Sequence, residues 1–136
     1  WVSVGNVRRK LLDELGGIVI DAIIVGEDQE YLSAFLIPNI SFCISFLNLK
    51  IKENKEIILS NQRIRNKILE ALINYKKDTK SKSQYIKKVV FFSGSLSKSN
   101  GEITDKGSIN QIKFILNREI LVKKLFLNQL KEIISI

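Results

Sequence analysis

The chain has 136 residues, of which 45% are hydrophobic and 26% are charged. These are the proportions of one ordinary globular domain with an adequate core, and the length leaves no room for a second domain. There is no histidine and a single cysteine, Cys43, which excludes a Cys–His nucleophile pair, an imidazole base and a conventional zinc site. No metal site is expected. Cys43 lies between Phe42 and Ile44 and is interpreted as a small buried hydrophobe.

The ends and the apolar segments favour a cytoplasmic piece of a longer polypeptide. The apolar runs at 18–20 and 22–25 are divided by Asp21 and are far too short to cross a bilayer. The first residues lack the pattern of a secretory signal. The chain begins at Trp1 and contains no methionine, which indicates a fragment. We therefore expect a cytoplasmic domain without a membrane partner.

The positive charge permits an anionic partner but does not require one. The formal net charge is +8 and the pI is near 9.6, which fits a protein that binds nucleic acid, a membrane or a phosphorylated ligand. The lysines are scattered, however, and their densest cluster, residues 76–82, contains no aromatic residue. A solvated surface is the simpler interpretation, and nucleic acid is not expected as the partner.

The first half of the chain predicts a helix followed by a hairpin. Trp1–Val4 alternates and is interpreted as the tail of a strand that ends at Gly5. Apolar residues then fall on one helical face as far as the glycine pair 16–17, at Val7, Leu11, Leu12 and Leu15. The β-branched segments 18–25 and 31–37 predict adjacent antiparallel strands, closed by Pro38 and Asn39. A short helix is expected over 41–47.

The second half predicts a helix, a strand, a long polar loop and a final helix. Ser60 is the expected N-cap of a helix whose apolar face holds Ile64, Ile68, Leu69, Leu72 and Ile73. Residues 86–92 predict a strand and 93–107 a polar loop. From Ser108, the expected cap, helical spacing at Ile109, Ile112, Leu116 and Ile120 predicts one long C-terminal helix. The fold class is α+β, with a small mixed or antiparallel sheet of about three main strands plus an N-terminal strand.

One loop motif points to a known family. The sequence Gly-Glu-Ile-Thr-Asp-Lys-Gly-Ser-Ile-Asn-Gln at 101–111 follows a strand and precedes a helix, with glycines on both sides of a lysine. It resembles the C-terminal lysine motif of the adenylate-forming superfamily, and most closely that of feruloyl-CoA synthetases. The opening segment 1–8 is similar to the strand and glycine turn that follow the hinge in that family, so the resemblance extends over nearly the whole chain.

Two departures limit what the resemblance carries over. The wider superfamily has Gly-Tyr-Arg-Ile at the turn, whereas Gly5 here is followed by Asn6 and Val7. The usual Ser-Gly-Lys spacing is replaced by Thr-Asp-Lys at 104–106. Lys106 is the natural equivalent of the catalytic lysine, and Lys98 stays open as an alternative.

The resemblance implies a C-terminal lid domain, spanning 1–136, of an ATP-dependent carboxylate–CoA ligase. ATP, Mg²⁺, CoA and the carboxylic acid would be bound mainly by an absent N-terminal AMP-binding domain, which is the implied partner. Lys106 would assist adenylation, Gly5 would admit the pantetheine arm of CoA, and Arg8 would contact a CoA phosphate. The simpler readings are that Gly5 ends a strand and that Arg8 lies on a solvated helix face.

Two other functions remain as alternatives. The chain is then either a basic module that binds nucleic acid or another anion, or a non-catalytic interaction domain.

Overall fold

The computed structural model describes residues 3–49 and 54–136, and within them it is an α+β structure of four strands and six α-helices. The helices and two 3₁₀ turns are α1 Val4–Leu15, η1 Gly16–Ile18, α2 Ile40–Phe46, α3 Lys55–Leu59, α4 Gln62–Lys77, η2 Lys82–Gln84, α5 Gln111–Asn117 and α6 Glu119–Phe126. The strands are β1 Val19–Val25, β2 Leu32–Pro38, β3 Ile86–Phe91 and β4 Ile134–Ser135. The predicted α+β class is confirmed.

The sheet is mixed and follows the order of the chain, β1-β2-β3-β4. β1 and β2 form the predicted antiparallel hairpin, with Ile23 opposite Phe35. β2 and β3 run parallel, with Phe35 opposite Val90, because α2, α3 and α4 carry the chain back between them. β4 pairs antiparallel with β3 and forms the far edge of the sheet.

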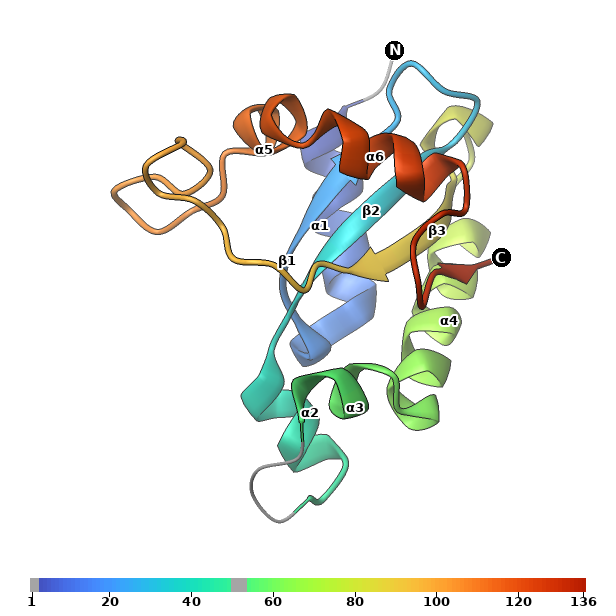
Figure 1. Cartoon of the computed structure of the whole chain (residues 1–136). Coiled ribbons are helices and arrows are strands. Elements are labelled where there is room, and N and C mark those ends of the chain that lie inside the picture. The colour runs from blue at the N-terminus through green and yellow to red at the C-terminus, as the bar shows by residue number, and fades with distance from the viewer. Residues whose placement is uncertain (1–2, 50–53) are drawn as a thin grey trace.

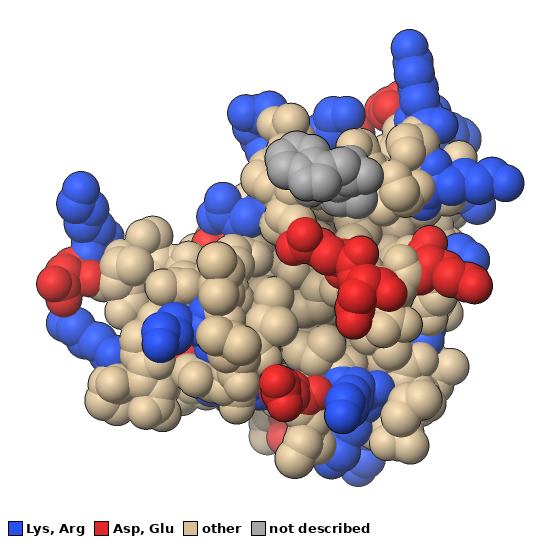
Figure 2. Space-filling view, turned by 90° about the horizontal axis from the view of Figure 1, so that it is seen from above, with Lys and Arg blue, Asp and Glu red and all other residues tan. Residues whose placement is uncertain are grey.

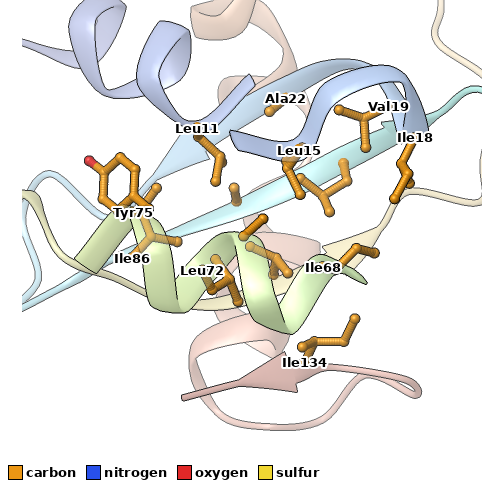
Figure 3. Close-up of a cluster of buried hydrophobic side chains, with 14 of the residues drawn as sticks. Leu11, Leu15, Ile18, Val19, Ala22, Ile68, Leu72, Tyr75, Ile86 and Ile134 are labelled. Carbon is orange, nitrogen blue, oxygen red and sulfur yellow. The ribbon is translucent and has the colours of Figure 1, made fainter. Parts of the chain in front are cut away.

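The sheet lies between two helical layers, so each of its faces has a core. α5 and α6 lie across one face, while α1 and α4 lie across the other (Figure 1). In the layer of α1 and α4, side chains of both helices point at each other over the strands (Figure 3), with Leu11, Leu72 and Tyr75 at most 1% exposed. The second core is smaller and is built around Phe35, Phe92 and Phe114.

The N-terminal strand prediction is wrong for the residues that the structure describes. Val4 is the first residue of α1, and Trp1 and Val2 lie outside the described residues. Ser3 has an extended backbone (φ −85°, ψ 95°), and its carbonyl accepts the first helical hydrogen bond from Val7 N at 3.1 Å. Four alternating residues were too short a pattern to outweigh the helical face that follows. The fourth strand is instead C-terminal.

The single long C-terminal helix is also wrong. The segment forms two short helices, α5 and α6, separated by Arg118, whose backbone leaves the helical region (φ −128°, ψ 40°). Asn110, rather than Ser108, caps α5 by accepting a hydrogen bond from Lys113 N at 3.0 Å. Likewise Asn61, rather than Ser60, caps α4, because its side chain accepts from Arg63 N at 2.9 Å.

Candidate functional site

The loop between β3 and α5 contains a small hairpin, residues 103–109, which we call the Lys106 hairpin. Ile103 and Ile109 form a β-bridge at its base. Above them, Thr104 N donates to Ser108 O at 2.8 Å and Gly107 N donates to Thr104 O at 2.9 Å. Gly107 has φ +83°, which is the left-handed geometry that closes a three-residue hairpin turn. Lys106 therefore stands at the centre of an ordered turn.

The side chain of Lys106 points into solvent. Lys106 and its neighbours Asp105 and Gly107 are all exposed, and the loop projects away from the edge of the sheet (Figure 1). Within residues 3–49 and 54–136, no ion pair or side-chain hydrogen bond engages the Lys106 ammonium. The amine is therefore available to a group outside the described chain.

A buried carboxylate stands at the foot of the hairpin. Glu102 is 1% exposed, and its oxygens accept hydrogen bonds from Arg118 Nε and Nη2, both at 2.8 Å, and from Ser97 N at 2.8 Å. Its backbone carbonyl accepts from Asn110 N at 2.8 Å. Glu102 therefore joins the start of the loop, the hairpin and the first turn of α5.

Arg118 supplies the other half of this ion pair. Its guanidinium lies over the rings of Phe92 (4.6 Å to the centroid) and Phe114 (5.2 Å), and Nη2 also donates to Ser95 O at 3.1 Å. The hydrogen bonds from Arg118 hold the pKa of Glu102 below its ordinary value of 4.5, against the opposing effect of burial. The same bonds raise the pKa of Arg118. Both groups are ionised at neutral pH.

Gln111 fixes the far end of the loop to the sheet. Its side-chain amide donates to Ala22 O at 2.8 Å and accepts from Ile24 N at 3.1 Å, so it satisfies backbone groups at the free edge of β1. The sequence motif includes Gln111 but gives no hint of this role, because its partners are distant in the chain. The sequence did not predict the ion pair of Glu102 with Arg118 either, since an acid in a polar loop is usually solvated.

The other predicted site residues lie elsewhere. Lys98 is exposed in the first part of the same loop, in a turn closed by Gly101 N to Lys98 O at 3.1 Å. Gly5 is exposed in the first turn of α1, where an added Cβ would meet nothing within 4 Å. Arg8 forms an ion pair with the buried Asp21 at 2.7 Å, which raises the pKa of Arg8. Gly5 and Arg8 thus belong to the layer of α1, whereas the Lys106 hairpin leads into α5.

One hollow in the described surface lies away from Lys106. A hollow of about 730 Å³ lies between the β1–β2 turn and α6, and its lining includes Gly26, Glu119 and Phe126 but no residue of the hairpin. In the described ranges, no three Cys, Asp or Glu side chains are gathered as metal ligands. A search of the same residues finds no helix with the length and hydropathy to span a membrane.

The charges show no continuous basic stripe on the face seen from above. Acidic side chains gather near the middle of that face, while most Lys and Arg side chains stand toward its edges (Figure 2). A basic stripe is the usual electrostatic footprint of a nucleic-acid site. This face of the molecule therefore gives no support to the nucleic-acid alternative.

Comparisons with known proteins show a shared fold. No family model and no curated protein sequence matches the chain. A solved structure of similar fold is described as the A-PCP didomain of carboxylic acid reductase from Segniliparus rugosus in complex with AMP. The match has a TM-score of 0.64 and 12% sequence identity, and it covers 93% of this chain. The chain corresponds to only 16% of the length of that didomain, and the likeness is one of fold.

Proposed function

We propose that this chain is the small C-terminal domain of an adenylate-forming carboxylate–CoA ligase and that Lys106 is its catalytic lysine. The observation that carries the proposal is an unpaired, exposed lysine at the apex of an ordered hairpin, in a motif that resembles the catalytic-lysine motif of that superfamily. The fold match to part of a protein solved with AMP supports it. The rest of the ligase would bind ATP, Mg²⁺, CoA and the acid.

The proposed chemistry uses a positive charge that this domain supplies to an active site in the rest of the ligase. In adenylation a carboxylate oxygen attacks the α-phosphate of ATP, pyrophosphate leaves, and two anionic groups must approach each other. An ammonium between them offsets their repulsion and holds them in line. Lys106 suits this task because its amine is exposed and has no competing carboxylate among the described residues. Because the rest of the ligase would bind Mg²⁺, the proposal assigns no metal ligand to these residues.

The CoA contacts are proposed for a second step. Gly5 leaves open space at the start of α1, which suits the close approach of a narrow pantetheine arm. Arg8 retains a role as a contact for a CoA phosphate, although its ion pair with Asp21 occupies part of the guanidinium. We expect both contacts to matter for thioester formation and not for adenylation.

The proposal is tested by separating the two steps in the full-length gene product. Lys106→Ala is expected to slow adenylate formation, measured by ATP–pyrophosphate exchange with a panel of carboxylic acids, by about 10²- to 10³-fold, the usual effect of losing one preorganised electrostatic contact. Thioester formation from a supplied acyl-adenylate should change little.

Two further variants complete the experiment. Lys124→Ala removes an exposed lysine from α6 and should leave both steps unchanged. Lys98→Ala distinguishes the two candidate lysines, because a selective loss of adenylation there would transfer the role from Lys106. Equal losses in both steps for Lys106→Ala, or no loss in either, would contradict the proposal.

A further inference from the structure

The support of the Lys106 hairpin depends on very few residues. Glu102 immediately precedes the hairpin bridge at Ile103. Asn110, which caps α5, immediately follows the bridge at Ile109. Between Ser95 and Gly101 the loop has no regular secondary structure. Gln111 holds the C-terminal side of the hairpin to β1, so the N-terminal side depends on what holds Glu102.

The Glu102–Arg118 pair holds it in a single geometry. A buried carboxylate is tolerated only when its oxygens are paired and hydrogen-bonded, and here the guanidinium fork and Ser97 N satisfy both oxygens. A second contact runs from Asn117 Nδ2 to Asn100 O at 3.1 Å. The guanidinium is in turn fixed by its stacking on two buried rings, so both partners have little freedom.

The break between α5 and α6 gives Arg118 this position. The residue leaves the helical region, which turns its side chain back toward the loop that precedes α5. A continuous helix, as the apolar spacing predicted, would give this residue an ordinary place in the helical repeat. The break thus links the geometry of α5 and α6 to the geometry of the hairpin.

We propose that Glu102 and Arg118 are positioning residues for Lys106, and that their ion pair fixes the direction in which the hairpin presents its amine to the adenylation site. This inference rests on the proposed function of Lys106. The pair is assigned no part in the reaction itself, since Glu102 is buried and the guanidinium of Arg118 is directed at its two oxygens. Its contribution is orientation, and small errors of orientation at a reacting centre are costly.

The test uses the full-length gene product with Glu102→Gln and Arg118→Lys. Glu102→Gln keeps the size of the side chain and Arg118→Lys keeps its charge, but each gives up the bidentate ion pair. We expect adenylation to slow by about 10- to 100-fold, with thioester formation from supplied adenylate nearly unchanged. Hydrogen exchange at the amides of Ser97, Thr104 and Gly107 should become faster. This second readout does not depend on activity.

Arg65→Lys is the matched control. Arg65 is exposed to a similar extent, 23% against 26% for Arg118, and it too donates to a glutamate, Glu132, at 3.1 Å and to a backbone carbonyl. It lies in α4 and holds the C-terminal segment rather than the loop. We expect it to leave the ratio of the two steps and the exchange of the hairpin amides unchanged.

The double variants decide the interpretation. If the pair acts through Lys106, Glu102→Gln adds no further loss of adenylation to Lys106→Ala. Full additivity, or a loss no larger than that of Arg65→Lys, would overturn the positioning role while leaving the catalytic lysine in place. If Lys106→Ala alone has no effect, the proposed function fails and the positioning role fails with it. Faster hydrogen exchange of the hairpin amides would then show only that the Glu102–Arg118 pair stabilises the structure of the loop.

Discussion

At the scale of single residues, the most informative group is Glu102. Its sequence neighbours include Ser, Gly and Asn residues, among which a glutamate is usually solvated, so the sequence did not indicate its burial. Its partner Arg118 lies 16 residues further on, beyond the reach of any local pattern. Cys43, by contrast, was correctly predicted to be buried, since its neighbours are apolar; it is 0% exposed, and burial raises the pKa of its thiol.

Glu102 gives a prediction for the effect of pH on stability. Its pKa is lower in the folded chain than its ordinary value of 4.5, so the ion pair contributes its full stability above pH 4.5 and loses it as the pH falls through the folded pKa. Glu102→Gln removes that dependence. The free energies of unfolding of the two proteins, measured by urea titration, should differ at neutral pH and converge in strong acid. A constant difference would contradict the prediction.

At the scale of elements, the segment after Ser108 forms helices as its spacing predicted, but the apolar residues used for that prediction lie mostly on the solvent side of the helices. Ile112, Leu116 and Ile120 are 71%, 59% and 73% exposed, and the second core is closed instead by Phe114 and Leu125, which are 0% exposed. Spacing alone does not show which of two apolar stripes meets the sheet. The break at Arg118, which no propensity signals, also changes the phase between α5 and α6.

Substitutions at the buried Phe114 and at the exposed Ile120 should therefore differ in their effect on the free energy of unfolding. Phe114→Ala should lower the free energy of unfolding by about 3–5 kcal/mol, because it leaves a cavity between the rings of Phe35 and Phe92. Ile120→Gln, on the exposed stripe, should change it by no more than about 0.5 kcal/mol. Urea unfolding measures both. Comparable losses of stability in the two variants would mean that Ile120 is buried and would contradict the prediction.

Elsewhere the predicted elements are close to those observed. The helix after Val7, the hairpin, the helix of Ile64 and Ile68, and the strand from Ile86 were each found within a few residues. These segments have strong periodicity and clear turn signals. The errors in strand and helix type lie at the two ends, where short patterns compete with tertiary contacts. In the middle of the chain, helix α3 (Lys55–Leu59) was not predicted and the cap of α4 was placed one residue early.

At the scale of the whole molecule, we expect the 136-residue chain to fold by itself and yet form no adenylate. Both faces of its sheet are covered by helices, which supplies the buried apolar surface that independent folding requires. Circular dichroism should show one cooperative thermal transition. The same sample should give no ATP–pyrophosphate exchange with acids that the full-length gene product activates. Exchange by the isolated chain would contradict the need for a second domain.

The parallel pairing of β2 with β3 constrains the order of assembly during synthesis. The β1–β2 hairpin joins neighbouring segments, but β3 reaches β2 only after the chain has passed through α2, α3 and α4, and closing such a long loop costs entropy before its contacts form. Until then the edge of β2 is unpaired and prone to join other chains. Arg118 emerges later still. A nascent chain therefore carries Lys106 before it carries the ion-pair partner of Glu102.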